Sequence, residues 1–86
     1  MKIENQEFYY VYILQSENDP DRFYIGFTKN IEQRLMQHNS GSDAHTSKFK
    51  PWKIKTLIAF TNRESAMDFE KYLKTASGRA FAIKRL

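Results

Sequence analysis

The sequence predicts an α+β fold, in which a small three-stranded, antiparallel-type sheet carries flanking helices in the order β-β-α-β-α-α. Three observations lead to this class. Residues 8–14 form a near-continuous apolar and aromatic run, which is typical of a buried strand. Residues 24–38 combine strand formers, a turn and an amphipathic helix in direct succession. Residues 61–76 place apolar side chains at helical spacing.

The first two strands are predicted to form a hairpin. Residues 8–14 make the first strand and residues 22–28 the second. The six residues 16–21 between them are rich in Ser, Asn, Asp and Pro, a composition typical of turns. Residues 1–7 are polar, so we expect a flexible lead-in there and a single domain over residues 8–86.

The helix that follows the hairpin has predicted caps at both ends. Asn30 is expected to cap its N-terminus, with Gln33 as the capping-box partner. The helix should run over residues 31–39 and end near Gly41. Residues 42–50 are polar and have no period, which predicts a loop.

A third strand is predicted over residues 52–60, because apolar residues alternate there with basic ones. Its apolar face is expected to hold Trp52, Ile54, Thr56 and Ile58. Thr61 and Glu64 then predict a capping box at the start of a second helix. The inward stripe of that helix is expected to consist of Ala66, Phe69, Leu73 and Ala76.

The chain is expected to end in a short third helix. Ser77 and Gly78 are predicted to break the second helix, since glycine is a poor helix former. The third helix should then cover residues 79–86, with Phe81 and Leu86 as its core anchors.

Composition and charge narrow the functional classes. The 86 residues contain no cysteine, which excludes disulfides and thiolate metal sites and favours a reducing compartment. No apolar run approaches membrane-spanning length, and the N-terminus has no signal-peptide pattern, so we expect a cytoplasmic protein. Residues 1–21 carry one base and five acids, whereas residues 44–86 carry ten bases and three acids. The basic C-terminal half indicates a polyanionic partner.

Residues 24–38 could also bind a phosphate. Arg34 and His38 are four residues apart and share one stripe of the predicted helix, and Tyr24 lies on the strand before it. The three side chains could converge on one phosphate group. Nearby cationic groups would contact further phosphates. The groups expected to do so are Lys29, His45, Lys48, Lys50 and Lys53.

Two short motifs resemble those of the GIY-YIG endonuclease superfamily. They are Tyr10-Val11-Tyr12 and Tyr24-Ile25-Gly26, whose key tyrosines, Tyr12 and Tyr24, are twelve positions apart. Arg34, His38 and Glu70 fall where that pattern places its remaining polar residues. The likeness spans most of the chain and is strongest to short stand-alone bacterial proteins, which resemble the nuclease domain of the excinuclease C subunit.

The resemblance implies a metal-dependent nuclease that cleaves nucleic acid, with DNA favoured and DNA repair as the setting. It assigns catalytic roles to Tyr12, Tyr24, Arg34 and His38. Glu70 is the expected metal ligand. A single carboxylate holds Mg²⁺ or Mn²⁺ weakly until substrate phosphate joins it. We expect the tyrosines on adjacent antiparallel strands, with their hydroxyls in one groove beside Arg34 and Glu70. No membrane partner is expected, and a monomer is favoured.

Two positions depart from the family pattern. Tyr10 replaces the glycine of the first motif, and no asparagine follows Glu70, although many family nucleases use a late one. Glu70 could also form an ordinary i,i+4 surface pair with Lys74. An inactive nucleic-acid-binding module of the same fold is therefore the alternative, and a protein-interaction domain with aromatic strand edges is a third class. Which tyrosine acts as base, and whether DNA or RNA is cut, stay open at this level.

Overall fold

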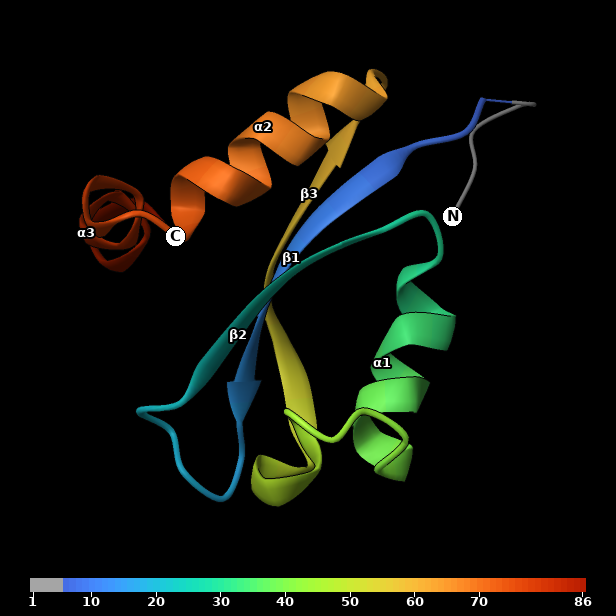
Figure 1. The fold of residues 1–86 in the computed structure, drawn as a ribbon, viewed down its shortest axis with the longest axis vertical. Coiled ribbons are helices and arrows are strands. Elements are labelled where there is room, and N and C mark those ends of the chain that lie inside the picture. Colours follow the sequence, from blue (N-terminus) through green and yellow to red (C-terminus); the bar gives the residue numbers. More distant parts are fainter. Residues whose placement is uncertain (1–5) are drawn as a thin grey trace.

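A computed structural model describes residues 6–86 and confirms the predicted order of strands and helices. Three strands form one antiparallel sheet in the spatial order β2-β1-β3 (Figure 1). They are β1 (Tyr9–Ser16), β2 (Phe23–Thr28) and β3 (Trp52–Phe60). Most of the predicted lead-in, residues 1–5, lies outside the described part of the chain.

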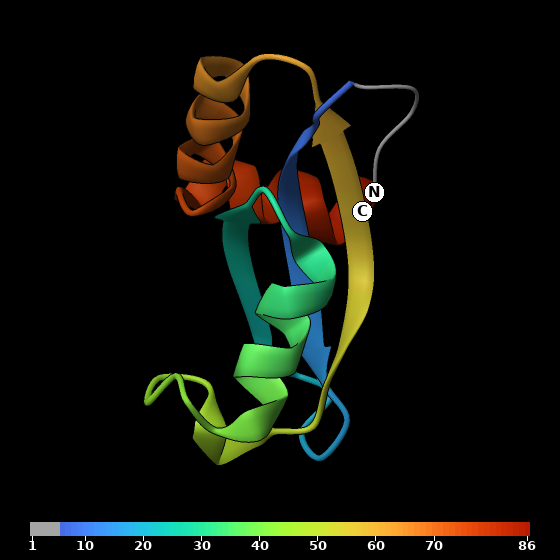
Figure 2. The same cartoon turned by 90° about the vertical axis from the view of Figure 1, so that its right-hand side faces the viewer.

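Helices cover both faces of the sheet (Figures 1 and 2). They are α1 (Ile31–Ser40), the short 3-10 turn η1 (Ser47–Phe49), α2 (Arg63–Leu73) and α3 (Ala76–Arg85). Helix α1 packs on one face, and α2 and α3 pack on the other. Within residues 6–86, no helix combines the length and the apolar character needed to cross a membrane.

The central strand β1 is buried on both faces, which explains its near-continuous apolar sequence. Val11 and Ile13 point toward α2 and α3 and form one core with Ala66 and Leu73. Tyr12 and the residues two positions along the strand point the other way, because side chains alternate along a strand. That second core, under α1, consists of Tyr12, Leu14, Ile31 and Trp52.

The single apolar face predicted for β3 is wrong, because the strand contains a bulge. Thr56 pairs with Ile13 and Ile54 with Leu14, which leaves Lys55 without a partner on β1. An extra residue reverses the facing of everything beyond it. Trp52 consequently packs under α1, whereas Thr56 donates a hydrogen bond to the Leu86 carbonyl on the α3 side (3.0 Å).

The predicted caps of α1 are confirmed, but the predicted cap of α2 is wrong. The Asn30 side chain accepts a hydrogen bond from the Gln33 amide, and Gly41 ends α1 in the left-handed region at φ +84°. For α2 the cap is Asn62, whose side chain accepts from the Ser65 amide at 2.9 Å. The sequence offers two capping residues in a row, and the helix begins one residue later than the Thr61 box predicts.

The junction of α2 and α3 also differs from the prediction. Helix α2 ends at Leu73, and Thr75 caps α3 by accepting from the Gly78 amide at 3.0 Å. Ala76 therefore begins α3 instead of closing the α2 stripe. Gly78 does not break a helix, since it lies in the first turn of α3. A β-carbon there would lie 1.8 Å from the Tyr72 carbonyl oxygen, so glycine is required by the close approach of the two helices.

The two predicted core anchors of α3 differ in how they are packed. Leu86 packs against the core formed with α2, as expected. Phe81 is partly exposed, and its ring lies 6.4 Å from Phe69 and 6.0 Å from Tyr72. Phe81 thus extends an aromatic cluster at the edge of the core.

Candidate active site

The two motif tyrosines lie on adjacent antiparallel strands, as expected. Tyr12 faces Gly26 across the β1–β2 ladder, and the Tyr24 ring lies 6.2 Å from the Tyr12 ring. A β-carbon on Gly26 would lie 2.3 Å from both the Cζ and the Oη of Tyr12. The phenol of Tyr12 therefore lies across the backbone of Gly26, and only glycine leaves room for it.

His38 links the Tyr12 hydroxyl to the loop after α1. Its imidazole is fully buried; Nε2 lies 3.1 Å from Tyr12 Oη, and Nδ1 lies 2.8 Å from Thr46 Oγ1. Thr46 Oγ1 in turn donates to the Asp43 carbonyl at 3.4 Å. One assignment satisfies all of these groups: Tyr12 donates to Nε2, and the Nδ1 proton of His38 goes to Thr46.

The protonation states follow from burial. Desolvation raises the pKa of Tyr12 to about 12; the Arg34 guanidinium opposes the rise, and the charge of Glu70 adds to it. Burial, and then the positive charge of Arg34, lower the pKa of His38, while Asp43 works in the opposite direction. Tyr12 is thus a neutral phenol and His38 a neutral imidazole near pH 7.

Arg34 reaches the same phenols from α1. Its guanidinium forms an ion pair with Asp43 at 3.0 Å and donates to the Gln37 side chain at 2.9 Å. Partial burial opposes the charged form, but Tyr12 and Tyr24 raise the pKa of Arg34 above its ordinary value. Two of its five N–H donors are engaged by Asp43 and Gln37, so the guanidinium is oriented and still able to bind an anion.

Glu70 comes from α2 on the other face of the sheet, yet its charge acts on Tyr12. Its side chain is 20% exposed, and the carboxylate accepts a hydrogen bond from Lys74 at 3.0 Å through Oε2. The alternative i,i+4 pair therefore exists. Within residues 6–86 no three His, Asp or Glu side chains gather as a metal site, so Glu70 would be a lone ligand. A lone carboxylate suits Mg²⁺, which completes its shell with water and substrate oxygens.

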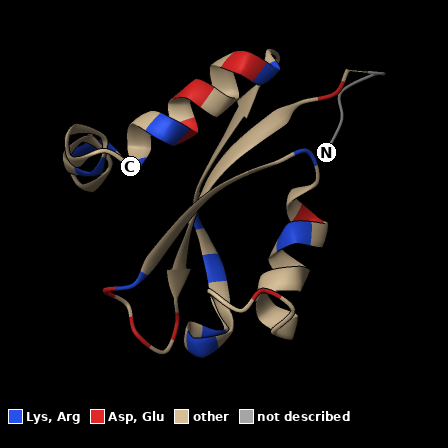
Figure 3. Ribbon diagram, viewed as in Figure 1, with Lys and Arg blue, Asp and Glu red and all other residues tan. Residues whose placement is uncertain are grey.

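The five predicted phosphate contacts do not form one surface. Lys29 follows β2 at its Thr28 end, where its ammonium lies 3.4 Å from Glu7 and 5.6 Å from the centre of the Tyr9 ring. The other four lie near the opposite end of the sheet, on the loop before β3 and on its first residues. These are His45, Lys48, Lys50 and Lys53, and all are exposed. Figure 3 shows the acidic β1–β2 turn at that same end.

Sequence reasoning missed two residues that hold the site together. Thr46, in the polar loop after α1, is buried: its hydroxyl contacts His38 Nδ1 and its carbonyl accepts from Trp52 Nε1 at 2.8 Å. Asp43 pairs with Arg34. Desolvation alone would raise the pKa of Asp43. Together, the hydrogen bond from the His45 amide and the interactions with His38 and Arg34 have the larger effect and lower the pKa. The available signal was a single Asp and Thr in a polar loop directly after the Arg34–His38 helix.

Comparison with known proteins identifies the matching family. A model of the GIY-YIG catalytic domain matches residues 8–84. The structure-specific endonuclease subunit SLX1 of Scheffersomyces stipitis is 41% identical over 70 residues, which cover 73% of this chain and 21% of that protein. Its counterpart in Debaryomyces hansenii is 40% identical over 75 residues, which cover 79% and 22%. The chain thus spans little more than a fifth of these curated relatives.

A solved structure has the same fold. The solution NMR structure of the UPF0213 protein BH0048 from Bacillus halodurans superposes with a TM-score of 0.54 and 28% identity. The alignment covers 90% of this chain and 83% of that one.

Proposed function

Since the chain belongs to the GIY-YIG catalytic-domain family, we propose that it is a metal-dependent nuclease that hydrolyses phosphodiester bonds, with DNA as the favoured substrate. One observation carries the proposal: the Tyr12 phenol contacts His38 and lies within the electrostatic reach of Arg34, Tyr24 and Glu70. Those groups come from four different elements. Together they provide a cation for phosphate and a proton relay at Tyr12, and a metal ligand whose charge acts on the same phenol.

Glu70 is the residue that would hold Mg²⁺ or Mn²⁺. Among the described residues only its Oε2 has a partner, Lys74, so Oε1 is available to a cation. The metal would supply positive charge to the phosphoryl oxygens and a lowered pKa for bound water. Lys74 competes for the same carboxylate, which agrees with weak metal binding before substrate arrives.

Tyr12 and His38 are proposed to accept the proton of the attacking water together. A phenol with a pKa of about 12 is a poor base when it must ionise alone. His38 Nε2, at 3.1 Å, can take the Tyr12 proton as Tyr12 Oη receives one from water. The phenolate then never accumulates, and Asp43, 3.8 Å from Nδ1, stabilises the imidazolium that forms.

Arg34 is proposed to bind a non-bridging phosphate oxygen. Its charge persists at all working pH values, and Asp43 and Gln37 fix its orientation. A pre-oriented guanidinium stabilises the charge that develops in the transition state without reorganisation.

A cleavage assay with Glu70→Gln tests the function. The assay would use branched, nicked and single-stranded DNA substrates with Mg²⁺ or Mn²⁺. The substitution keeps size and helix propensity and removes the negative charge, so cleavage should fall by about a hundredfold or more. The exposed Asp68 on the same helix provides the matched control, Asp68→Asn. Cleavage by Glu70→Gln at the rate of the control would remove Glu70 from the mechanism.

A binding module without catalysis is the second candidate. It is favoured by the absence of an asparagine after Glu70 and by the Glu70–Lys74 ion pair. In that case the unmodified chain binds the substrates with a strong salt dependence and cuts none of them with either metal.

A further inference from the structure

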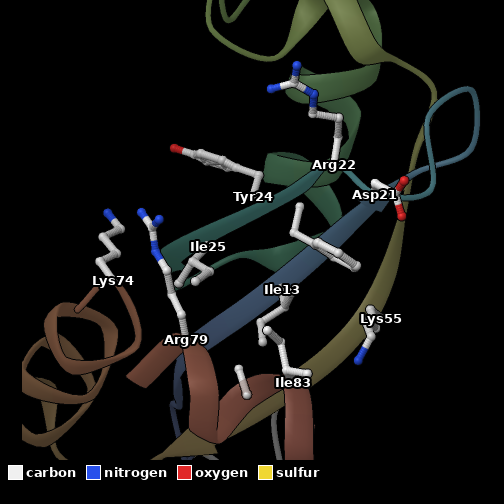
Figure 4. Close-up of a pocket in the computed structure, with 11 residues that line it drawn as sticks. Ile13, Asp21, Arg22, Tyr24, Ile25, Lys55, Lys74, Arg79 and Ile83 are labelled. Carbon is white, nitrogen blue, oxygen red and sulfur yellow. The ribbon is translucent and has the colours of Figure 1, made fainter. Parts of the chain in front are cut away.

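A hollow on the far side of β2 from α1 carries charge that the proposed mechanism does not use. Its volume is about 640 Å³, and it lies between α3 and the strands (Figure 4). We call it the α3 hollow. Apolar side chains of β1, β2 and α3 line it, together with one carboxylate and four cations. The cations are Arg22, Lys55, Lys74 and Arg79.

The four cations of the α3 hollow differ in whether they already form an ion pair. Arg22 is paired with Asp19 at 3.4 Å and lies over the Phe49 ring, so it points away from the hollow (Figure 4). Lys74 binds Glu70. For Arg79 and Lys55, no ion pair or side-chain hydrogen bond is formed within residues 6–86. Both are therefore available to an anion.

The fold holds the two free cations at the hollow. Arg79 directly follows Gly78, whose close contact with the α2 carboxyl end positions the first turn of α3. Lys55 is the bulged residue of β3, and bulges redirect side chains away from the regular ladder. Neither placement depends on a flexible loop.

The α3 hollow adjoins the candidate active site through two shared residues. Tyr24 lines the hollow, and Lys74 both lines it and binds the expected metal ligand Glu70. Figure 4 shows Lys74 and Arg79 extending in the same direction, toward the end of the Tyr24 phenol. A strand that passes from the active site into the hollow would therefore meet Arg79, which lines the same hollow as Tyr24.

The apolar lining indicates which form of nucleic acid fits. Phe23 is 48% exposed and Ile83 is 86% exposed beside the cations. A duplex presents mainly phosphates to such a surface, whereas an unstacked base offers a face that an aromatic ring can cover. Cations combined with an exposed ring are typical of sites for single strands.

We propose that the α3 hollow binds an unpaired nucleic-acid strand next to the active site, with the two free cations Arg79 and Lys55 on its phosphates and Phe23 against a base. The proposal rests on the proposed function, because it makes the hollow the path of the strand that is cut. On this proposal, α3 and the edge of β2 would give the protein a preference for substrates with unpaired segments.

Binding measured without cleavage tests the proposal. The probes are a fluorescent single-stranded oligothymidylate and a blunt hairpin duplex, titrated by fluorescence anisotropy in EDTA over a range of salt concentrations. Arg79→Ala should weaken single-strand binding severalfold and reduce its salt slope by about 0.7. Phe23→Leu, which keeps an apolar side chain and removes the ring, should weaken it by roughly five- to a hundredfold. Duplex binding should change little in either variant.

Lys84→Ala is the charge-matched control, because Lys84 is exposed on α3 and does not line the hollow. Equal losses in Arg79→Ala and Lys84→Ala would overturn the proposal, and so would equal losses for single strand and duplex. Melting curves of each variant show that it is folded. Because EDTA removes catalysis, a protein that cuts no substrate but passes this test contradicts the proposed nuclease function and leaves the binding site intact.

Discussion

Tyr12 is held on three sides, by the Gly26 backbone below its ring, His38 at its hydroxyl and Tyr24 beside it. The family motif supplies the glycine and both tyrosines, and the structure gives the reason for the glycine. Its hydrogen is the only substituent that fits under the phenol. The tyrosine and the glycine therefore act as one unit, although fourteen positions separate them in the sequence.

The first prediction concerns this contact. Gly26→Ala places a methyl group 2.3 Å from the Tyr12 ring and should destabilise the fold by about 1–3 kcal/mol and abolish cleavage. Tyr12→Leu removes the ring, so the double variant Gly26→Ala/Tyr12→Leu should cost less than the sum of the two single changes. Urea denaturation of the four proteins measures this coupling. Additive losses would mean that the methyl group clashes elsewhere.

A second prediction concerns the buried imidazole. The pKa of His38 is lowered from 6.5 in the folded protein, so the unfolded chain takes up the proton first as the pH falls. The resulting stability is complete above the unfolded pKa and is lost as the pH falls toward the folded pKa. The melting temperature should therefore drop between about pH 7 and pH 5.

His38→Gln should be less stable at pH 7 and should have a flatter dependence of melting temperature on pH over that window. The pKa of Asp43 is lowered from 3.8, so its own contribution falls at lower pH and does not interfere. His45→Gln, which removes an exposed imidazole, is the control and should keep the wild-type slope. If His38→Gln keeps that slope as well, another group causes the acid sensitivity.

At the scale of elements, the helix starts were the least secure part of the sequence interpretation. Thr61 and Asn62 are both good capping residues, and the local pattern favoured the first. The exit of β3 from the sheet leaves Asn62 extended, at φ −114° and ψ 123°, and its side chain caps the helix. Tertiary context therefore chose between two nearly equal local signals.

The roles of Thr61 and Asn62 can be compared by replacing each of them with alanine. Asn62→Ala should destabilise the protein by about 1 kcal/mol, because the Ser65 amide loses its acceptor. Thr61→Ala should stay within about 0.5 kcal/mol of the wild type. Chemical denaturation of both variants measures the difference. A larger loss for Thr61→Ala than for Asn62→Ala would restore the predicted capping box.

At the scale of the whole molecule, opposite charges gather at one end. The acidic β1–β2 turn lies beside the basic loop that precedes β3 (Figure 3), and Asn18 donates to the Lys50 carbonyl at 2.7 Å. Neighbouring carboxylates lower the positive electrostatic potential around this loop. Binding of nucleic acid there should therefore depend more on contacts between individual lysines and phosphates than on a broad positive potential. Lys29 would contact phosphate at the other end of β2.

Replacing Lys48 and Lys50 together with Ala should weaken duplex and single-strand binding to a similar degree. The slope of log affinity against log salt should fall by about 0.9 for each duplex phosphate that a lysine no longer neutralises. Fluorescence anisotropy at several salt concentrations measures this slope, with Lys84→Ala as the control. Unchanged affinity in the double variant would exclude the loop from the footprint.

The sequence by itself determined the order of the elements, the hairpin and the placement of both tyrosines on one side of it. These features depend on local composition, on the alternation of side chains along a strand and on a short turn, all of which act between near neighbours. The caps of α1 were predictable for the same reason, since Asn30 and Gly41 each act within one helical turn.

Only the tertiary structure decided how the site is assembled. The contact of His38 with Thr46, the charge of Glu70 acting on Tyr12 and the bulge at Lys55 each depend on where distant segments pack. Such long-range packing depends on the free energy gained when whole faces of the sheet are buried. Short sequence patterns do not encode that free energy. For that reason the motif supplied the residues proposed to react, and the fold alone supplied Asp43 and Thr46, which contact Arg34 and His38.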